Sequence, residues 1–166
     1  MNCKEELKIC RFKAQSKYDR CRDCRQECSD LHITRGEKKS SYTLDNPDRI
    51  AVIVFHVDGG VVHNEENCCK CDYIYDIKTS QTSAVIFIEL KGRHYEEALK
   101  QIENSVKLFK EAFYGSKFYA RIVCTRFPNI NNNPTSRKIK TFLKEQKINL
   151  DNGKFTMKES IKDLLK

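Results

Sequence analysis

The N-terminal part of the sequence lacks an uninterrupted hydrophobic run. Residues Met1–Lys13 alternate charged and apolar types, which excludes a secretion signal or a membrane anchor there. We therefore expect a cytoplasmic protein with no membrane contact. Internal repeats, low-complexity tracts and a break in composition are also missing, and 166 residues suffice for one hydrophobic core.

Acidic residues are too few to balance the basic ones. The chain has 31 Lys and Arg against 23 Asp and Glu, which leaves a formal charge of +8. A basic excess favours a polyanionic partner such as nucleic acid. Solubility alone is the alternative explanation for so many lysines, and composition does not decide between the two.

A disulfide framework is not expected, because the nine cysteines are an odd number and cytoplasmic thiols stay reduced. Two groups of cysteines together could form a tetrahedral zinc site that ties the N-terminal segment to the rest of the fold. Free thiols are the alternative, since no second Cys-x-x-Cys occurs and His32 and His63 are competing ligands. Cys124 lies in an apolar segment and is expected in the core. The candidate zinc ligands are Cys21, Cys24, Cys28, Cys68, Cys69 and Cys71.

The polar character of residues 1–48 predicts short helices and loops, which we interpret as a Cys-rich N-terminal extension. A β-branched run, Ile50–Phe55, then predicts a buried strand that begins the main domain, residues 49–166. The turn signal Asp58-Gly59-Gly60 follows, and Val61 and Val62 can start a returning strand.

The remaining pattern predicts an α+β fold, with a mixed central β-sheet flanked by helices. The first expected elements are a hairpin of strands 71–77 and 84–90 around the polar stretch 78–83, and a helix from Tyr95 to Phe113 that Gly115 closes. A strand 118–125 follows, and then a basic helix that Thr135 or Ser136 caps and that ends near Gln146. A turn at 151–153 precedes the last helix, which begins with a capping box of Thr156 and Glu159 and ends at Leu165.

The second hairpin brings acidic and basic side chains together. Side chains alternate along a strand, so Glu89 and Lys91 share one face. A symmetric turn at 78–83 places Asp72 opposite Glu89 and leaves Asp76 opposite Val85. Two opposed carboxylates repel each other unless a cation lies between them. A hard ion such as Mg²⁺ or Mn²⁺ fits these oxygen ligands, and with the lysine beside it phosphodiester hydrolysis is the reaction class.

These residues resemble a known family. The segment Cys71-Asp72-Tyr73-Ile74, the run Val85 to Gly92 and the helix that carries Ala98 and Gln101 are similar to the PD-(D/E)xK nuclease superfamily. The resemblance covers about residues 50–145 and implies a restriction-endonuclease-like core. It implies that Asp72, Glu89 and the backbone of Leu90 hold the metal, that Lys91 is the catalytic lysine, and that Gln101 matches a glutamine common on that helix.

The pattern departs from the family in two ways. Cys71 stands where the motif has proline, and no upstream helix offers an unambiguous acidic ligand, which leaves Glu65 or Glu66 as candidates. The alternative for the acid-x-lysine pattern is a polar strand end, and Gln101 could equally be a solvated helix residue.

Histidines and basic residues outside the hairpin complete the candidates. His56 and His94 lie near element ends and are expected at the surface or in packing. The basic residues of the C-terminal half could follow a phosphate backbone, with a solvated helix face as the equal alternative. They are Arg121, Arg126, Arg137, Lys138 and Lys140.

The sequence therefore predicts a Mg²⁺-dependent or Mn²⁺-dependent DNA endonuclease, with a homodimer or a larger complex as its candidate assemblies. Two alternatives stay open. One is a binding module of the same fold that contacts nucleic acid or protein without cleavage, and the other is a small nuclease subunit of a larger defence or repair complex.

Overall fold

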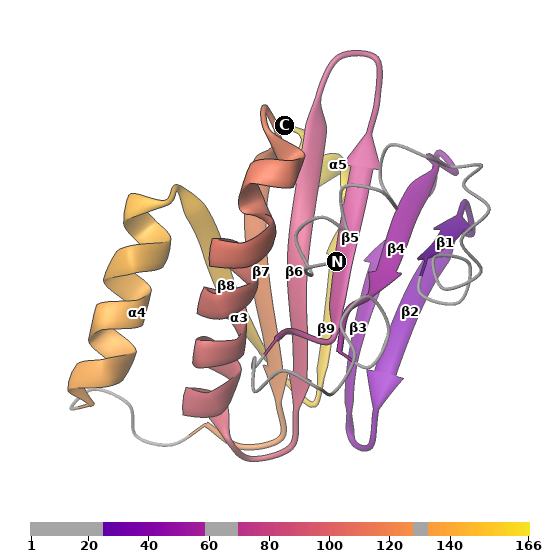
Figure 1. Cartoon of the computed structure of the whole chain (residues 1–166). Helices are drawn as coiled ribbons and strands as arrows, with labels where there is room; N and C mark the ends of the chain where they lie inside the picture. Colours follow the sequence, from indigo (N-terminus) through magenta and orange to yellow (C-terminus); the bar gives the residue numbers. More distant parts are fainter. Residues whose placement is uncertain (1–24, 59–69, 128–132) are drawn as a thin grey trace.

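The computed structural model describes residues 25–58, 70–127 and 133–166. These residues form an α+β fold of three layers (Figure 1). A large sheet lies in the middle, helices α3 and α4 pack on one of its faces, and a smaller sheet with helix α5 packs on the other. Each face of the large sheet therefore borders its own hydrophobic core.

The large sheet has six strands within the described residues, in the order β1-β4-β5-β6-β7-β8. In this sheet β1, β4, β5 and β6 pair antiparallel with their neighbours in that order, whereas β7 pairs parallel with both β6 and β8. The sheet is therefore mixed, as the sequence predicted. The strands are β1 (Arg25–Cys28), β4 (Val52–His56), β5 (Tyr73–Lys78), β6 (Ser83–Lys91), β7 (Lys117–Cys124) and β8 (Ile148–Lys154).

The small sheet joins the two ends of the described chain. Its strands β2 (His32–Glu37) and β3 (Ser40–Asp45) form an antiparallel hairpin, and β9 (Thr156–Ser160) pairs parallel with β3. Ile33, Tyr42 and Leu44 of this sheet are buried against the large sheet. The small sheet thus covers the face that the long helices leave open.

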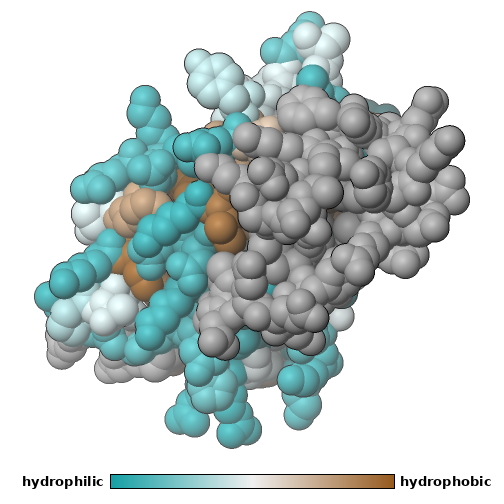
Figure 2. All heavy atoms as spheres, viewed as in Figure 1, coloured by the Kyte–Doolittle hydropathy of each residue, from teal (hydrophilic) through white to brown (hydrophobic). Residues whose placement is uncertain are grey.

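The helices of the described residues are α3 (Tyr95–Phe109), α4 (Pro134–Glu145) and α5 (Ile161–Leu165), and a 3₁₀ turn at Lys110–Phe113 extends α3. The apolar residues Tyr95, Ala98, Leu99, Ile102, Val106 and Phe109 recur at helical spacing and form one buried stripe along α3. Figure 2 shows mainly hydrophilic side chains on the outward surface of α3 and α4, with a few hydrophobic residues between them. None of the helices among these residues is long and apolar enough to cross a membrane.

Several predicted elements are wrong. Residues 25–45 form strands, not short helices and loops, and the predicted turn 151–153 lies inside β8. Thr156 and Glu159 do not cap a helix, because they belong to β9, and Ser160 caps α5 instead. Asn133 replaces Thr135 and Ser136 as the cap of α4, since its side chain accepts hydrogen bonds from both of their backbone N–H groups.

A buried ion pair fastens the small sheet to the large one. The guanidinium of Arg121 on β7 donates from Nε to Glu159 Oε1 on β9 at 2.9 Å, and Tyr42 OH on β3 donates to the same oxygen at 2.5 Å. Arg121 also donates to the backbone carbonyl of Asn149 at 2.8 Å. Arg121 is only 4% exposed, so its charge is satisfied inside the protein.

Candidate active site

The β5–β6 hairpin has the register that the sequence predicted. Tyr73 pairs with Ile88 and Asp76 pairs with Val85, and Thr79 and Thr82 close the turn through a backbone hydrogen bond. Continuing this register by one residue beyond Tyr73 brings Asp72 beside Glu89. The alternation of side chains along β6 places Glu89 on the same face as Val85 and Phe87, which is the face that α3 covers.

Asp72 is held at the end of β5. Its Oδ2 accepts a hydrogen bond of 2.7 Å from the backbone N–H of Leu90, and its carbonyl accepts one of 2.8 Å from the backbone N–H of Val57. Burial raises the pKa of Asp72 to about 6. The Leu90 N–H opposes this rise, and the negative charge of Glu37 adds to it. The carboxyl is therefore poised to lose its proton near neutral pH.

Glu89 is fully buried, with 0% of the residue exposed. Neither of its carboxylate oxygens has a hydrogen-bond partner within the described residues. The nearest positive charge is Lys91 Nζ, 3.5 Å from Oε1. Burial and then the charge of Asp72 raise the pKa of Glu89 well above its ordinary value, whereas Lys91 lowers it. The Lys91 ammonium offsets part of this charge, but a buried carboxylate whose two oxygens accept no hydrogen bond within the described residues remains costly.

Lys91 connects this buried pair to the protein surface. Its side chain is 27% exposed while its ammonium lies against Glu89. Its backbone carbonyl accepts a hydrogen bond of 3.1 Å from Ser40 Oγ, from the start of β3. Asp72, Glu89 and Lys91 are therefore brought together by the fold, as the sequence predicted.

Helix α3 orients the segment that precedes Asp72. Gln101 is buried and donates from Nε2 to the carbonyl of Lys70 at 3.1 Å, so the alternative of a solvated helix residue is wrong. Ser105, one turn further on, accepts a hydrogen bond of 2.8 Å from the backbone N–H of Cys71. Sequence analysis missed Ser105, although its four-residue spacing from Gln101 puts both on one helix face. These side chains position the backbone beside Asp72.

The residues of this site fit a divalent metal of the magnesium class. Such an ion uses one or two protein carboxylates and completes its shell with waters and substrate phosphates. Asp72 and Glu89 supply the carboxylates, and the backbone carbonyl of Leu90 lies between Glu89 and Lys91 in the chain. Within residues 25–58, 70–127 and 133–166 there is no group of three or more His, Cys, Asp or Glu arranged to hold a metal. A site rich in protein ligands, as zinc prefers, is therefore not formed by these residues.

The described members of the predicted zinc set lie far apart. Cys28 pairs with Val52 at one end of the sheet, whereas Cys71 precedes Tyr73 at the other, roughly 20 Å away at about 3.3 Å per residue. They also pack in different cores on opposite faces, and both are free thiols. These two cysteines do not share one ion. The other predicted zinc ligands, with the alternative ligand His63, lie outside the described residues; they are Cys21, Cys24, Cys68 and Cys69. The candidate acids Glu65 and Glu66 and the predicted strand start Val61–Val62 also lie outside them.

The basic residues divide into two groups. Arg121 is buried in its ion pair with Glu159, so it does not belong to an exposed binding surface and that prediction is wrong. The other four are exposed, and the ammonium of Lys140 lies 5.8 Å from the ring centre of Tyr95 at the start of α3. They are Arg126, Arg137, Lys138 and Lys140.

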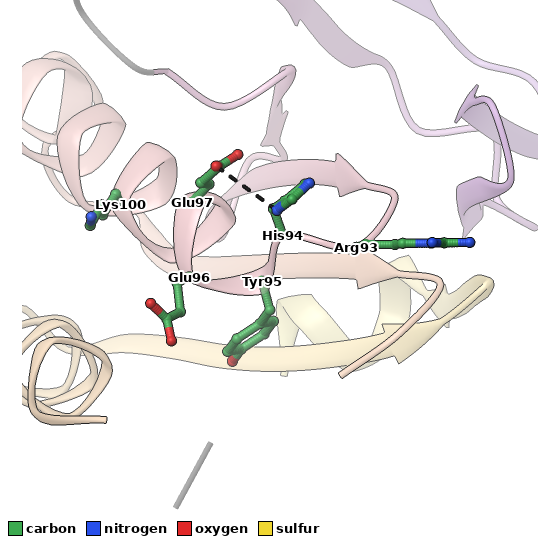
Figure 3. A pocket seen from close by; sticks show the side chains of 6 residues that line it. All are labelled: Arg93, His94, Tyr95, Glu96, Glu97 and Lys100. Carbon is green, nitrogen blue, oxygen red and sulfur yellow. Dashed lines mark ion pairs between the residues drawn. The ribbon is translucent and has the colours of Figure 1, made fainter. Parts of the chain in front are cut away.

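A pocket of about 330 Å³ lies at the beginning of α3 (Figure 3), and Asp72, Glu89 and Lys91 are not among its lining residues. Its lining mixes charges, because Glu96 and Glu97 stand among basic side chains. His94 is exposed and its Nδ1 lies 4.0 Å from Glu97 Oε1. His56 is also exposed and stacks on Tyr73 with ring centres 5.2 Å apart. Both histidines therefore have the surface or packing positions that the sequence predicted.

Comparisons of the chain with protein-family models, with curated proteins and with solved structures found no match.

Proposed function

We propose that the protein is a metal-dependent nuclease that hydrolyses phosphodiester bonds in DNA, with a PD-(D/E)xK-type site in a restriction-endonuclease-like core. One observation carries the proposal. Glu89 is fully buried beside Asp72, and neither Glu89 oxygen has a hydrogen-bond partner within the described residues. A protein that folds around such a carboxylate gains little stability from it, so a role in binding a cation explains its presence.

Each residue has a separate task in this proposal. Asp72 and Glu89 hold Mg²⁺ or Mn²⁺, which polarises a phosphoryl oxygen when bound. Lys91 keeps its ammonium next to Glu89 and reaches the surface, where it can orient the attacking water or offset charge on the phosphate. Gln101 and Ser105 hold the backbone before Asp72 and act through it.

The order of elements supports the same proposal. Strand β6 delivers Glu89 and Lys91 to the end of the central sheet, and α3 follows directly and packs over them. The exposed basic residues Arg137, Lys138 and Lys140 lie on α4, which packs beside α3. We further propose a cytoplasmic protein, because its described cysteines are free thiols.

The test is cleavage by the full-length protein. Plasmid, linear duplex, single-stranded DNA and RNA are incubated with the protein in Mg²⁺, in Mn²⁺ and in EDTA. We expect metal-dependent cleavage of DNA that is lost in Glu89→Gln, a variant that keeps the side-chain volume and removes the charge. Cleavage that persists in EDTA, or that is equal in the variant, would come from a different site or a contaminant.

A binding module without cleavage is the second candidate, and one contact favours it. Asp72 Oδ2 already accepts a hydrogen bond from Leu90, so this carboxylate also has a structural role at the strand end. Thermal unfolding separates the two candidates, because only a metal site is stabilised by Mg²⁺ through mass action. An unfolding temperature that does not change with Mg²⁺, together with retained DNA binding, would favour the binding module.

A further inference from the structure

The turn between β2 and β3 lies against the candidate active site. Ser40, the first residue of β3, is 4% exposed and its Oγ donates to the carbonyl of Lys91 at 3.1 Å. The turn residues Lys38 and Lys39 directly precede Ser40 in the chain. Consecutive Cα atoms lie about 3.8 Å apart, so both lysines begin within about 8 Å of the Ser40 backbone.

The tip of this hairpin is exposed and basic. The side chain of Lys38 is 82% exposed, and Lys39 is exposed as well. The neighbouring Glu37 lies 3.6 Å from Lys38 Nζ, but an exposed ion pair of this kind is weak and leaves the lysine available to a stronger anion. Lys38 has a φ of 53°, which fixes the tight turn that presents both ammonium groups.

The charges of this hairpin lie beside the site. Glu37 pairs with Ser40 in the β2–β3 hairpin, and Ser40 Oγ donates to the carbonyl of Lys91, so the end of β2 lies close to that end of β6. Other exposed lysines of the small sheet and α5 already face carboxylates of this chain: Lys158 lies 3.0 Å from Asp45, and Lys162 lies 3.0 Å from Asp48. The hairpin tip carries two lysines against one glutamate and therefore keeps a net positive charge.

We propose that Lys38 and Lys39 contact the phosphate backbone of the nucleic acid beside the cleavage site, so that the β2–β3 hairpin is a substrate-binding element. This inference rests on the proposed nuclease function and names the surface that holds its substrate. Phosphates follow one another at about 3.4 Å along the axis for each strand of a duplex. Two adjacent lysines next to Lys91 therefore reach phosphates within a few nucleotides of the one that is cleaved.

The experiment measures binding, so that it does not depend on turnover. A fluorescein-labelled DNA duplex is titrated with the full chain in EDTA at several salt concentrations, and affinity is followed by fluorescence anisotropy. The slope of log K against log salt is negative, and each lost lysine–phosphate contact reduces its magnitude by about 0.9. We expect Lys38→Gln with Lys39→Gln to reduce the magnitude of this slope by about 1.8.

The matched control is Lys78→Gln with Lys147→Gln. Both residues are exposed, and Lys78 lies at the opposite end of β5 from Asp72. Lys147 has a φ of 56°, so each pair of substitutions removes two charges and includes one residue in the left-handed region. We expect the control to keep the wild-type slope. A complementary variant, Glu37→Gln, should strengthen binding, because it removes a negative charge from the hairpin.

The outcomes separate this inference from the proposed function. Hairpin-dependent binding without metal-dependent cleavage would overturn the nuclease and keep the hairpin surface. If the wild-type protein shows metal-dependent cleavage but the hairpin variant binds DNA like the wild type, the nuclease is kept and the hairpin surface is overturned. An equal loss of slope in the hairpin and control variants, no DNA binding by the wild type, or hairpin-dependent binding to polyglutamate alone would each overturn the inference.

Discussion

The Asp72 carboxylate and the Leu90 backbone N–H are joined by a hydrogen bond of 2.7 Å. Leu90 directly follows Glu89 on β6, so this contact fixes the distance between the two carboxylate-bearing segments. The contact needs only a side-chain oxygen at position 72, and an asparagine supplies one. The charge of Asp72 can therefore be removed while the contact at the strand end is kept.

Asp72→Asn and Glu89→Gln are each expected to lower metal-supported cleavage by about 100-fold or more, because each removes one charged metal ligand. Glu89→Gln should also raise the unfolding temperature of the metal-free protein, since a buried charge is replaced by a neutral group. Cleavage assays and thermal unfolding of the same preparations check both expectations. A destabilised Glu89→Gln protein would mean that Glu89 serves the fold and not a metal.

Asp76→Asn is the internal control for these variants. Asp76 lies four residues from Asp72 on β5, roughly 13 Å along the strand, which is too far to bind the same ion. It should retain near-normal cleavage per folded molecule, with the folded fraction taken from the unfolding curve because Asp76 is buried. Loss of cleavage in Asp76→Asn but not in Asp72→Asn would move the metal site along the hairpin.

Lys91→Met is expected to lose turnover and keep metal binding, because Lys91 lies at the site but supplies no oxygen ligand. The apolar stem remains, so packing at the strand end changes little. Lys91 lowers the pKa of Glu89, and without it that pKa should rise further, so metal binding should shift to higher pH. Calorimetric titration with Mg²⁺ or Mn²⁺ at several pH values measures this shift. Wild-type turnover in Lys91→Met would remove Lys91 from the mechanism.

The hairpin of the site was predictable from sequence because its evidence is local. Apolar residues fill β6 without interruption from Ala84 to Ile88, and the symmetric polar turn fixes which residues of β5 face it. The helix after Gly92 was equally clear, because its stripe repeats over four turns. The alternation placed Glu89 and Lys91 on one face, and in the structure the Lys91 ammonium lies 3.5 Å from Glu89 Oε1.

The small sheet could not be predicted, because its stability comes from pairing between distant segments. Strand β3 buries Ser40, Tyr42 and Leu44 in strict alternation, but only two of the three are apolar. Its partner β9 lies more than a hundred residues later in the chain and carries Lys158 and Glu159. The turn signal at 151–153 was overridden in a similar way. Gly153 pairs with Val123 in β8, at a position where a Cβ would lie only 2.7 Å from the Met157 Cβ, so the glycine serves a close approach and not a turn.

Arg121→Ala should destabilise the fold by about 3 kcal/mol or more, since it leaves Glu159 and Tyr42 without their buried cation. Urea unfolding with a shared m-value measures this loss. The salt dependence of DNA binding should not change, because the buried guanidinium does not reach a phosphate. If Arg121→Ala keeps the wild-type stability and makes the salt dependence of DNA binding less steep, Arg121 belongs to the DNA-binding surface.

The raised carboxyl pKa values predict how stability and metal binding depend on pH. In the folded protein the pKa of Asp72 is about 6, above its ordinary value, and that of Glu89 is raised as well. Between the ordinary carboxyl pKa and the raised ones, the folded state binds more protons than the unfolded state. The free energy of unfolding therefore decreases as pH rises through this window, and the decrease due to Asp72 is complete above about pH 6.

Metal binding follows the opposite direction, because both carboxyls must lose their protons to hold the ion. Without metal, the unfolding temperature should be lower at about pH 8 than at about pH 5, and Glu89→Gln should reduce this difference. The rise in unfolding temperature on adding Mg²⁺ should be larger at the higher pH. Thermal unfolding of both proteins, with and without Mg²⁺, gives these values. A wild-type protein that gains stability with pH in EDTA, or that Mg²⁺ stabilises more at the lower pH, would mean that the two carboxylates are not a metal site.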